Sequence, residues 1–345
     1  MAEKTSIGWC DHTFNPCIGC TKVSPACDNC YAEVWGKRFG VEWGPNAPRR
    51  RTSAAYWKQP LRWNRKSQIA HDAWDKFKTT QGFVKPRCPR VFCGSLCDVF
   101  DNAAPEQWRQ DLFNLILSTP HLDWLLLTKR IGNTRKMIED ILPANMKALP
   151  SGHPLEWPWA NVWIGSTICN QEEADRDIPK LLAVPAAKRF LSIEPMLSEI
   201  DLSKWLACAC NEYWPGQGHP KDCPVGKIDW IIVGGETGPH ARPMHPDWVR
   251  GLRDQCQAAG TAFFMKQWGE WADMKTAGIA ESGPVMTRTG RVKDWLRQAV
   301  TFAGGTKCTV QAHSWTGHGT NLMYRVGAKA AGRMLDGREW SEFPA

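Results

Sequence analysis

The sequence has no apolar run that approaches the roughly 18 residues needed for a membrane-spanning helix. Its first segment, MAEKTSIGWCDHTFNP, lacks the charged-then-apolar pattern of a signal peptide. An extended Lys/Arg block is also missing, so the net charge of +8 only modestly favours a polyanionic partner, and a solvated basic surface explains it equally well. These absences lead us to expect a cytoplasmic protein with no membrane partner, in which thiols stay reduced.

Cysteine and tryptophan are abundant instead. The chain of 345 residues has 14 cysteines and 20 tryptophans, and its hydrophobic fraction of 43% is normal for one large domain or two ordinary ones. The tryptophans are spread along the chain, so we expect most of them in the core or in a cleft. Grouped cysteines in a reducing compartment bind metal more often than each other, which makes metal binding the first hypothesis.

Short apolar β-rich runs alternate with helical patterns from residue 89 onward. There are six such runs, and four of them are clearly followed by a stretch with helical apolar spacing. Continuous apolar strands separated by helices are typical of a parallel sheet buried on both faces. The sequence therefore predicts an α/β protein with a complete or partial βα-barrel and with functional side chains at the carboxyl ends of its strands. The runs are residues 90–95, 123–129, 161–167, 188–194, 229–235 and 261–267.

Three segments fall outside this alternation. Residues 40–88 are rich in Pro, Arg and Trp and predict a packed excursion, and residues 203–227 form an insertion with its own cysteines. Residues 271–345 are Gly-rich with basic patches and predict a C-terminal extension. We therefore expect a barrel domain over residues 1–270, with a cysteine loop at residues 15–33, followed by that extension.

The cysteine loop has the spacing C-x2-C-x6-C-x2-C, formed by Cys17, Cys20, Cys27 and Cys30. A zinc ribbon separates its two pairs by about 15–20 residues, so this spacing is tight for that site. The first three cysteines also resemble half of a binuclear zinc cluster, but the other half is not found nearby. An iron–sulfur cluster accepts closely spaced thiolates from one loop. Four bound thiolates would close such a cluster, whereas three would leave one iron open for a ligand that reacts.

Other distinctive segments occur in order along most of the chain: LLLTKR, LSIEPML, DWIIVGGETGPHARPMHPDWV, FFMKQWG and RVGAKAAGRMLDGREW. Together with WCDHTFNPCIGCTKVSPACDNCYAE they resemble the phage-associated three-Cys-motif proteins, a family related to radical S-adenosylmethionine (radical-SAM) enzymes. The resemblance places that family's C-x6-C-x2-C triad on Cys20, Cys27 and Cys30. Cys17 stands where the family usually has a non-cysteine residue. The resemblance implies a partial βα-barrel of the radical-SAM type, with its cluster loop after the first strand, in the cytoplasm of the host cell if a phage encodes it.

The resemblance also implies cofactors and a partner. Three thiolates would hold a [4Fe–4S] cluster, whose fourth iron would chelate the amino and carboxylate groups of S-adenosylmethionine. One electron, from a donor such as flavodoxin or ferredoxin, would then yield a 5′-deoxyadenosyl radical that abstracts hydrogen from the substrate. Cys17 is expected to be a bystander, because a fourth thiolate would block the cofactor.

Polar and small residues at the strand ends are the candidates for holding S-adenosylmethionine. Ser95 and Asp98 follow the first of the six runs, where such enzymes place polar groups against the methionine amino group. Asp98 could instead cap the helix that begins near Ala104. The full set of cofactor-binding candidates is Asn29, Ser95, Asp98, Ser166, Ser192, Glu194, Gly234, Gly235 and Glu236.

Two of these groups have ordinary structural alternatives. Ser192 and Glu194 share the end of a strand and suit ribose hydroxyls, whereas a carboxylate paired with Lys129 or Arg189 would only organise the barrel mouth. The Gly-Gly-Glu run at 234–236 suits close backbone approach to a ligand, because glycine tolerates positive φ. A bare tight turn explains that run nearly as well.

The groups expected around the substrate are polar or cationic, namely Lys129, His245, Lys266 and Gln267 as catalytic candidates with Arg130 beside them. Cations there suit a phosphate or a nucleotide, while salt bridges within the barrel mouth are the equal alternative. Trp124 and Trp268 could stack on a base, although core packing is the commoner role for either tryptophan.

The insertion contributes a second cysteine set, C-x-C-x8-H-x3-C, formed by Cys208, Cys210, His219 and Cys223. These residues suit zinc in number and type, although C-x-C is an uncommon opening for a zinc site. A second iron–sulfur cluster is the alternative.

The leading hypothesis is a radical S-adenosylmethionine enzyme that modifies or repairs a nucleic acid base or a nucleotide. A non-catalytic zinc- or iron–sulfur protein that binds nucleic acid is the alternative from another class. An iron–sulfur electron-transfer module is a third, and it would need Cys17 as a ligand.

Overall fold

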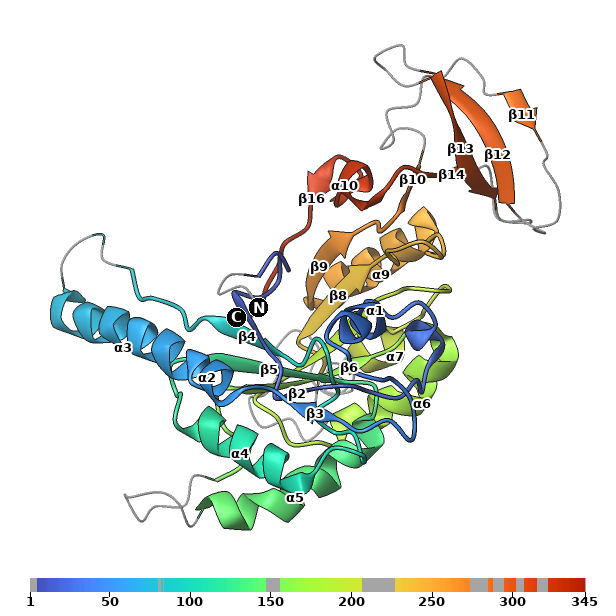
Figure 1. Ribbon diagram of the computed structural model, residues 1–345. Coiled ribbons are helices and arrows are strands. Elements are labelled where there is room, and N and C mark those ends of the chain that lie inside the picture. The colour runs from blue at the N-terminus through green and yellow to red at the C-terminus, as the bar shows by residue number, and fades with distance from the viewer. Residues whose placement is uncertain are drawn as a thin grey trace. The chain divides into compact units, whose positions relative to one another are not determined.

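The computed structural model describes residues 5–79, 82, 84–146, 156–206, 227–273, 285–287, 295–301, 307–314 and 322–344. The chain divides into two compact units, and Figure 1 colours it by residue number from the N-terminus to the C-terminus. Unit 1 comprises residues 1–167, 176–191 and 224–228, and unit 2 comprises residues 168–175, 192–223 and 229–345.

The main sheet has seven strands in the order β1-β4-β5-β6-β7-β8-β9. The pairings of β1 with β4, β4 with β5, β5 with β6 and β8 with β9 are all parallel. The predicted partial βα-barrel is therefore confirmed as the fold class. The strands are β1 (His12–Phe14), β4 (Arg90–Cys93), β5 (Asp123–Thr128), β6 (Val162–Thr167), β7 (Lys188–Ile193), β8 (Trp230–Gly234) and β9 (Ala262–Gln267).

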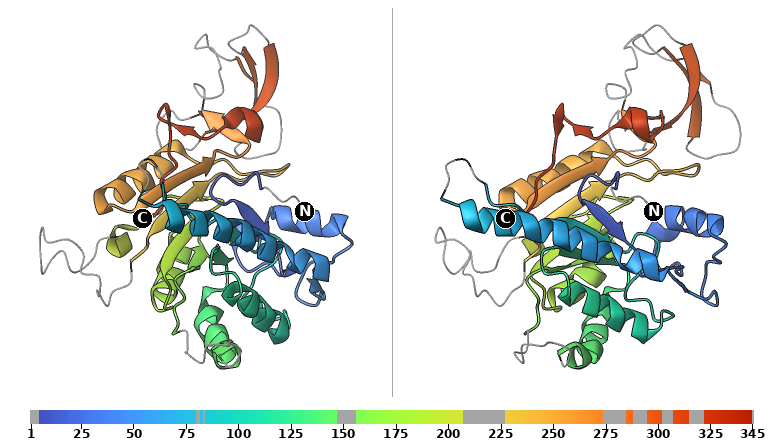
Figure 2. Two further views of the ribbon diagram at one scale, coloured as in Figure 1. Left: turned by 90° about the vertical axis from the view of Figure 1, so that its left-hand side faces the viewer. Right: turned by 60° about the vertical axis from the view of Figure 1, so that its left-hand side comes forward.

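Four helices follow strands in the predicted places: α4 (Glu106–Leu117), α5 (Ile131–Met146), α6 (Gln171–Leu182) and α9 (Pro246–Ala259). Figure 1 shows α4 and α5 side by side in unit 1. Figure 2 shows α9 along β9 in unit 2. His245 caps the start of α9, and Gly260 ends it with a φ of 65°, a conformation that glycine adopts without strain.

Within the main sheet, β1 lies outside the six predicted runs. It has three residues and precedes the cysteine loop, and it pairs with β4 in the register His12 with Val91. Its short length hides it from pattern analysis, because alternation needs four residues or more to be recognised.

The N-terminal part of unit 1 holds the cysteine loop and the predicted excursion. The loop contains β2 (Cys17–Ile18), the 3-10 turn η1 (Pro25–Cys27) and helix α1 (Tyr31–Arg38). The excursion contains β3 (Arg50–Arg51), α2 (Ala54–Trp57) and α3 (Gln59–Phe77). β2 pairs antiparallel with β3, so the excursion is tied to the cysteine loop by backbone hydrogen bonds.

Aromatic residues fill the core of unit 1, as the scattered tryptophans predicted. The Trp9 ring lies 4.7 Å from that of Phe92, and the Phe14 ring meets Trp124 edge to face at 5.6 Å. All four side chains are buried. Aromatic pairs in these geometries stabilise the fold beyond the area that they bury.

Unit 2 contains a second sheet, which has five strands in the order β10-β14-β13-β12-β11. Its pairings are antiparallel. The strands are β10 (Trp271–Asp273), β11 (Val285–Thr287), β12 (Trp295–Thr301), β13 (Lys307–Ser314) and β14 (Leu322–Arg325), and the short helix α7 (Ser203–Leu206) belongs to the same unit.

The C-terminal tail returns to β9 after α10 (Ala328–Ala331) and the hairpin of β15 (Met334–Leu335) and β16 (Arg338–Glu339). The Met265 N–H donates to the Trp340 carbonyl at 3.0 Å, and the Glu342 N–H donates to the Phe263 carbonyl at 3.1 Å. The tail is therefore hydrogen-bonded along β9. Within the described residues, no helix combines the length and the apolar character needed to cross a membrane.

Candidate functional site

The cysteine loop is fastened to the carboxyl end of β4. The Gly19 N–H donates to the Leu96 carbonyl at 3.1 Å, and Gly19 forms an isolated bridge with Cys97. Gly19 has a φ of 117°, which side chains rarely adopt, so glycine is needed for the chain to turn here. This anchor places Cys20 just beyond the strand end.

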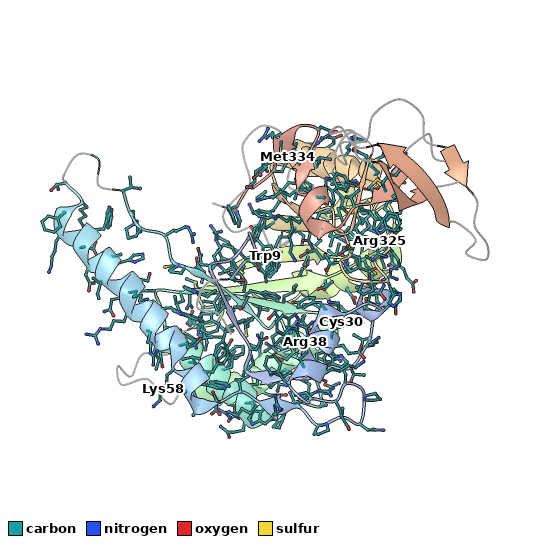
Figure 3. All side chains as sticks on the ribbon, turned by 45° about the horizontal axis from the view of Figure 1, so that its top comes forward. Trp9, Cys30, Arg38, Lys58, Arg325 and Met334 are labelled. Atoms are coloured by element: carbon teal, nitrogen blue, oxygen red, sulfur yellow. The ribbon has the colours of Figure 1, made fainter. Side chains whose placement is uncertain are left out.

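Cys20, Cys27 and Cys30 lie on three different local structures of this loop. Cys20 is half-buried after Gly19, Cys27 is buried at the end of η1, and Cys30 is the N-cap of α1, where Figure 3 labels it. All three are free thiols. Cys30 is half-buried, so its sulfur is accessible to a metal ion.

Arg130 connects the Cys20 thiol to the end of β5. Its Nη1 donates to Cys20 Sγ at 3.3 Å and to Asp98 Oδ2 at 3.3 Å, and its Nη2 donates to the Thr21 carbonyl at 2.8 Å. Burial raises the pKa of the Cys20 thiol to about 11, and the Arg130 charge opposes that shift. Arg130 is thus the group that favours a thiolate at Cys20.

Asp98 is fully engaged within the protein. Its Oδ1 accepts from the Thr128 hydroxyl at 2.7 Å and from the Phe100 N–H at 3.0 Å. Its Oδ2 accepts from the Lys129 N–H at 3.0 Å as well as from Arg130. The carboxylate therefore joins the ends of β4 and β5 and does not cap α4.

A second buried ion pair, Arg49 with Asp101, holds the loop from the other side. Arg49 Nε donates to Asp101 Oδ2 at 2.7 Å, and their side chains are 1% and 5% exposed. The Arg49 Nη2 donates to the Thr21 hydroxyl at 2.7 Å. Sequence analysis did not single out either residue. The Arg run at 49–51 is the signal that could have drawn attention to Arg49.

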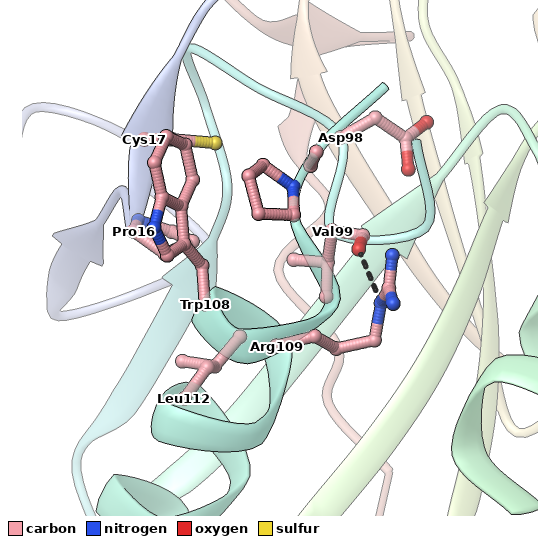
Figure 4. Close-up of a pocket in the computed structure, with 9 residues that line it drawn as sticks. Pro16, Cys17, Asp98, Val99, Trp108, Arg109 and Leu112 are labelled. Atoms are coloured by element: carbon pink, nitrogen blue, oxygen red, sulfur yellow. Dashed lines mark hydrogen bonds between the residues drawn. The ribbon is translucent and has the colours of Figure 1, made fainter. Parts of the chain in front are cut away.

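Cys17 lies beside a small cavity that Asp98 also lines. It is buried in β2 and lines a cavity of about 10 Å³ beside Trp108 and Leu112 (Figure 4). The cavity has room for about one water molecule. The hydrogen bond drawn in Figure 4 runs from Arg109 Nε to the Val99 carbonyl oxygen at 3.1 Å. Cys17 also forms a hydrogen bond with the Cys97 thiol, and the pKa of Cys97 is raised mainly by that bond.

The thiol set of Cys20, Cys27 and Cys30 fits an iron–sulfur cluster in ligand type, ligand number and charge environment. Three thiols that are not in disulfides share one anchored loop, and a buried guanidinium contacts one of them. Within the described residues, however, no three His, Cys, Asp or Glu side chains are already gathered around a point that could hold a metal ion. The loop therefore supplies the donors without presenting a preformed cage.

Ser95 and Ser166 stand in different surroundings. Ser95 is half-buried and accepts a hydrogen bond from the Asn15 amide at 3.0 Å. Ser166 is fully buried at the end of β6, and its hydroxyl has no hydrogen-bond partner among the described residues. The neighbouring Thr167 hydroxyl is in the same state. Buried polar groups are normally paired, so this strand end has capacity for a ligand.

In unit 2, Glu194 forms an ion pair with Lys266 across 2.8 Å, at 15% and 23% side-chain exposure. The Ser192 hydroxyl lies 3.4 Å from the other carboxylate oxygen. A Cβ on Gly234 would come within 2.5 Å of Glu194 Oε1, so glycine there makes room for the carboxylate. Glu194 thus pairs with Lys266 and not with Lys129 or Arg189, the alternatives that the sequence left open.

Gly235, in the Gly-Gly-Glu run at 234–236, allows close packing against the backbone of Trp268. A Cβ on Gly235 would collide with the Trp268 carbonyl oxygen, and the Gly235 N–H donates to the Gln267 carbonyl at 2.9 Å. Glu236 is buried and holds Arg242 through both oxygens at 2.7 and 2.9 Å. Close backbone approach is therefore present here, toward Trp268.

The remaining candidates have mixed surroundings. His245 is buried as the N-cap of α9, accepting from the Asp247 N–H at 3.1 Å. Trp124 and Trp268 are both core residues, so neither presents a free face for a base. Lys129 is half-buried, and its ammonium group has no ion pair within the described parts of the chain. Asn29 and Gln267 are half-buried.

Cys208, Cys210, His219 and Cys223, the predicted second metal set, lie outside the described residues. A metal site formed by these four residues therefore stays a prediction.

Comparison with known proteins identifies the family of this chain. Among curated proteins, no sequence matches it. Among solved structures, a mutant spore photoproduct lyase with bound AdoMet and dinucleoside spore photoproduct is similar at 9% identity and a TM-score of 0.35, over 81% of this chain and 67% of that chain. The family described as "Protein of unknown function (DUF5131)" matches residues 4–344. Because this match spans nearly the whole chain, the protein belongs to the DUF5131 family.

Proposed function

We propose that this protein is a radical S-adenosylmethionine enzyme whose cluster is held by Cys20, Cys27 and Cys30. The observation that carries the proposal is the loop itself: three free thiols share one loop that is anchored at Gly19 to the segment after β4, and Arg130 and Arg49 tie that loop to Asp98 and Asp101. When bound, a [4Fe–4S] cluster would supply one electron to S-adenosylmethionine and so generate a 5′-deoxyadenosyl radical.

The chain's own residues would hold the loop and the cofactor. Arg130 would favour the thiolate form of Cys20, and its bonds to Thr21 and Asp98 would keep the loop at the strand end. The unpartnered hydroxyls of Ser166 and Thr167 would accept polar groups of S-adenosylmethionine.

Nucleic acid bases or nucleotides are the substrate class that we propose. The support is the net charge of +8 and the position of Lys129 directly after β5, where its backbone N–H donates to Asp98. Modification is the first reaction type to test and repair is the second.

The electron donor would dock on α1, the helix that Cys30 caps. Tyr31, Val34 and Trp35 are exposed on it by 47%, 54% and 46%. Lys37 and Arg38 end the same helix. An apolar patch with a basic end suits an acidic one-electron donor such as flavodoxin or ferredoxin.

Anaerobic purification with iron and sulfide analysis tests the cluster. The wild type and Cys17→Ala should carry a [4Fe–4S] cluster and release 5′-deoxyadenosine from S-adenosylmethionine under a reductant, whereas Cys20→Ala should lose both. Cys256→Ala, which removes a buried thiol of α9, is the matched control and should behave as wild type. A colourless, iron-free zinc protein would contradict the proposal and favour a non-catalytic nucleic-acid-binding protein. Loss of iron in the Cys17 variant would show that Cys17 is needed to hold the cluster and would contradict the proposed set of three ligands.

A further inference from the structure

Four side chains with metal-binding atoms line one open cavity of unit 1, away from the cysteine loop in sequence. His71 comes from α3, Cys88 precedes β4, His121 precedes β5, and Asp123 begins β5. All four are half-buried. The cavity has a volume of about 550 Å³, so solvent and ions reach these side chains.

The contacts of the His71 ring indicate which tautomer a neutral ring would adopt. Its Nδ1 lies 2.9 Å from the Ser67 carbonyl oxygen, one turn earlier in α3. A carbonyl oxygen only accepts, so Nδ1 carries the proton and Nε2 of the neutral ring has the free lone pair. A backbone carbonyl on the far nitrogen is the usual support of a metal-binding histidine.

The Nε2 lone pair faces the Cys88 thiol, with 3.9 Å between Nε2 and Sγ. On one tetrahedral zinc ion, a nitrogen at about 2.1 Å and a sulfur at about 2.3 Å are about 3.6 Å apart. The two atoms are therefore already near the separation that a shared ion would impose.

His121 is close enough to His71 to supply a third ligand. Its ring centroid is 5.2 Å from that of His71, and its backbone N–H is fixed to α3 by the Asn64 side chain at 2.8 Å. Two imidazole rings on one tetrahedral zinc ion have their centroids about 5 Å apart. The three side chains are not yet gathered around one point, so binding would require side-chain rotation.

The cationic side chains that line the cavity are engaged elsewhere. Lys85 and Arg87 line it, but Arg87 is held by Asp11 through two bonds of 2.7 Å, and Lys85 lies over the Trp74 ring. Asp123 lies in the same lining, so a cation in the cavity would have a carboxylate beside it.

We propose that His71, Cys88 and His121 form a binding site for a zinc-like divalent transition metal, with Asp123 as the neighbouring carboxylate. The nitrogen and sulfur donors select zinc or cobalt over calcium or magnesium. The site would fasten α3 to the two segments that lead into β4 and β5. It is independent of the function proposed for the cysteine loop.

Metal content of the full-length chain tests this site by difference. After equilibration with zinc and removal of unbound metal, His71→Gln, His121→Gln and Cys88→Ser should each hold about one equivalent less zinc than wild type. His240→Gln, an exposed histidine, and Cys256→Ser should lose none. The other cysteine sets are present in every variant, so they cancel in the comparison.

Cobalt reports the ligand type. The wild type minus Cys88→Ser difference spectrum should contain a thiolate-to-cobalt charge-transfer band, and zinc should raise the thermal midpoint of wild type more than that of His71→Gln. Circular dichroism verifies that each variant is folded. If one variant fails to fold, the other two carry the comparison. Unchanged zinc in His71→Gln and His121→Gln, or a difference spectrum without that band, overturns the proposal.

Discussion

Removing the Arg130 guanidinium is the sharpest test of how the cysteine loop is held. The change is Arg130→Gln, which keeps a polar side chain but removes the charge. Arg130 is 10% exposed and donates to Cys20, Thr21 and Asp98. It also lies 3.8 Å from Asp101.

The magnitude follows from those contacts. Three lost hydrogen bonds at about 1 kcal/mol net each give about 3 kcal/mol. Breaking a buried ion pair by removing one partner destabilises by about 3–5 kcal/mol. Asp98 keeps its bonds from Thr128, Phe100 and Lys129, and Asp101 keeps Arg49, so neither carboxylate is left unpaired. We therefore expect a loss of about 3 kcal/mol in the free energy of unfolding.

Urea denaturation followed by tryptophan fluorescence measures this loss. The matched control is Arg135→Gln on α5, because Arg135 pairs with Glu139 at 62% and 59% exposure. An exposed pair of this kind contributes about 0.5 kcal/mol or less. The Cys20 thiol should also react more slowly with a thiol reagent at pH 9 in the Arg130 variant, since loss of the neighbouring charge raises its pKa further. Equal stabilities of the two variants would refute the buried-network argument.

Three further predictions rest on other contacts. Burial raises the pKa of the Asp123 carboxyl to about 6, so its contribution to stability is present below pH 4 and is lost as the pH rises through 6. In EDTA, Asp123→Asn should therefore be more stable than wild type by about 1–3 kcal/mol at pH 8 and by much less at pH 4. The opposite order in urea titrations would contradict this prediction. Gly235→Ala should lose more than about 3 kcal/mol or be insoluble, because Cβ meets the Trp268 carbonyl, whereas Gly251→Ala in α9 meets nothing and should gain about 0.5–1 kcal/mol in thermal denaturation. Lys37→Glu should slow 5′-deoxyadenosine release several-fold with flavodoxin as the donor and leave it unchanged with dithionite; slowing with both would place the effect outside docking.

Sequence patterns were sufficient for the sheet, because a buried parallel strand must be apolar along its whole length. All six predicted runs contain a strand, from Arg90–Cys93 to Ala262–Gln267. His12–Phe14 escaped detection because three residues carry no periodicity, although the family resemblance implied a strand before the loop. The return of Trp340 to β9 could not be predicted, since edge pairing depends on backbone proximity and leaves no pattern in the side chains.

The residue types of the candidate site could be predicted from the sequence, but the hydrogen-bond and ion-pair partners of those residues could not. The loop cysteines follow from their spacing, but the role of Asp98 depends on four donors brought together only by folding. The same holds for Glu194 and Lys266, which are 72 positions apart in the chain and only 2.8 Å apart across their ion pair. The run of arginines at 49–51 draws attention to Arg49, but it does not show which of the three is buried.

The tail that lies along β9 has a consequence for handling the protein. β9 is the last strand of the parallel sheet, and residues 340–342 occupy hydrogen-bonding positions beside it. An uncovered strand at that position would offer its amide and carbonyl groups to another chain, which is how sheets polymerise edge to edge. By covering the edge of β9, the tail therefore protects the protein from edge-to-edge aggregation. Expression variants cut before Trp340 should form visible aggregates at concentrations where the intact chain stays clear.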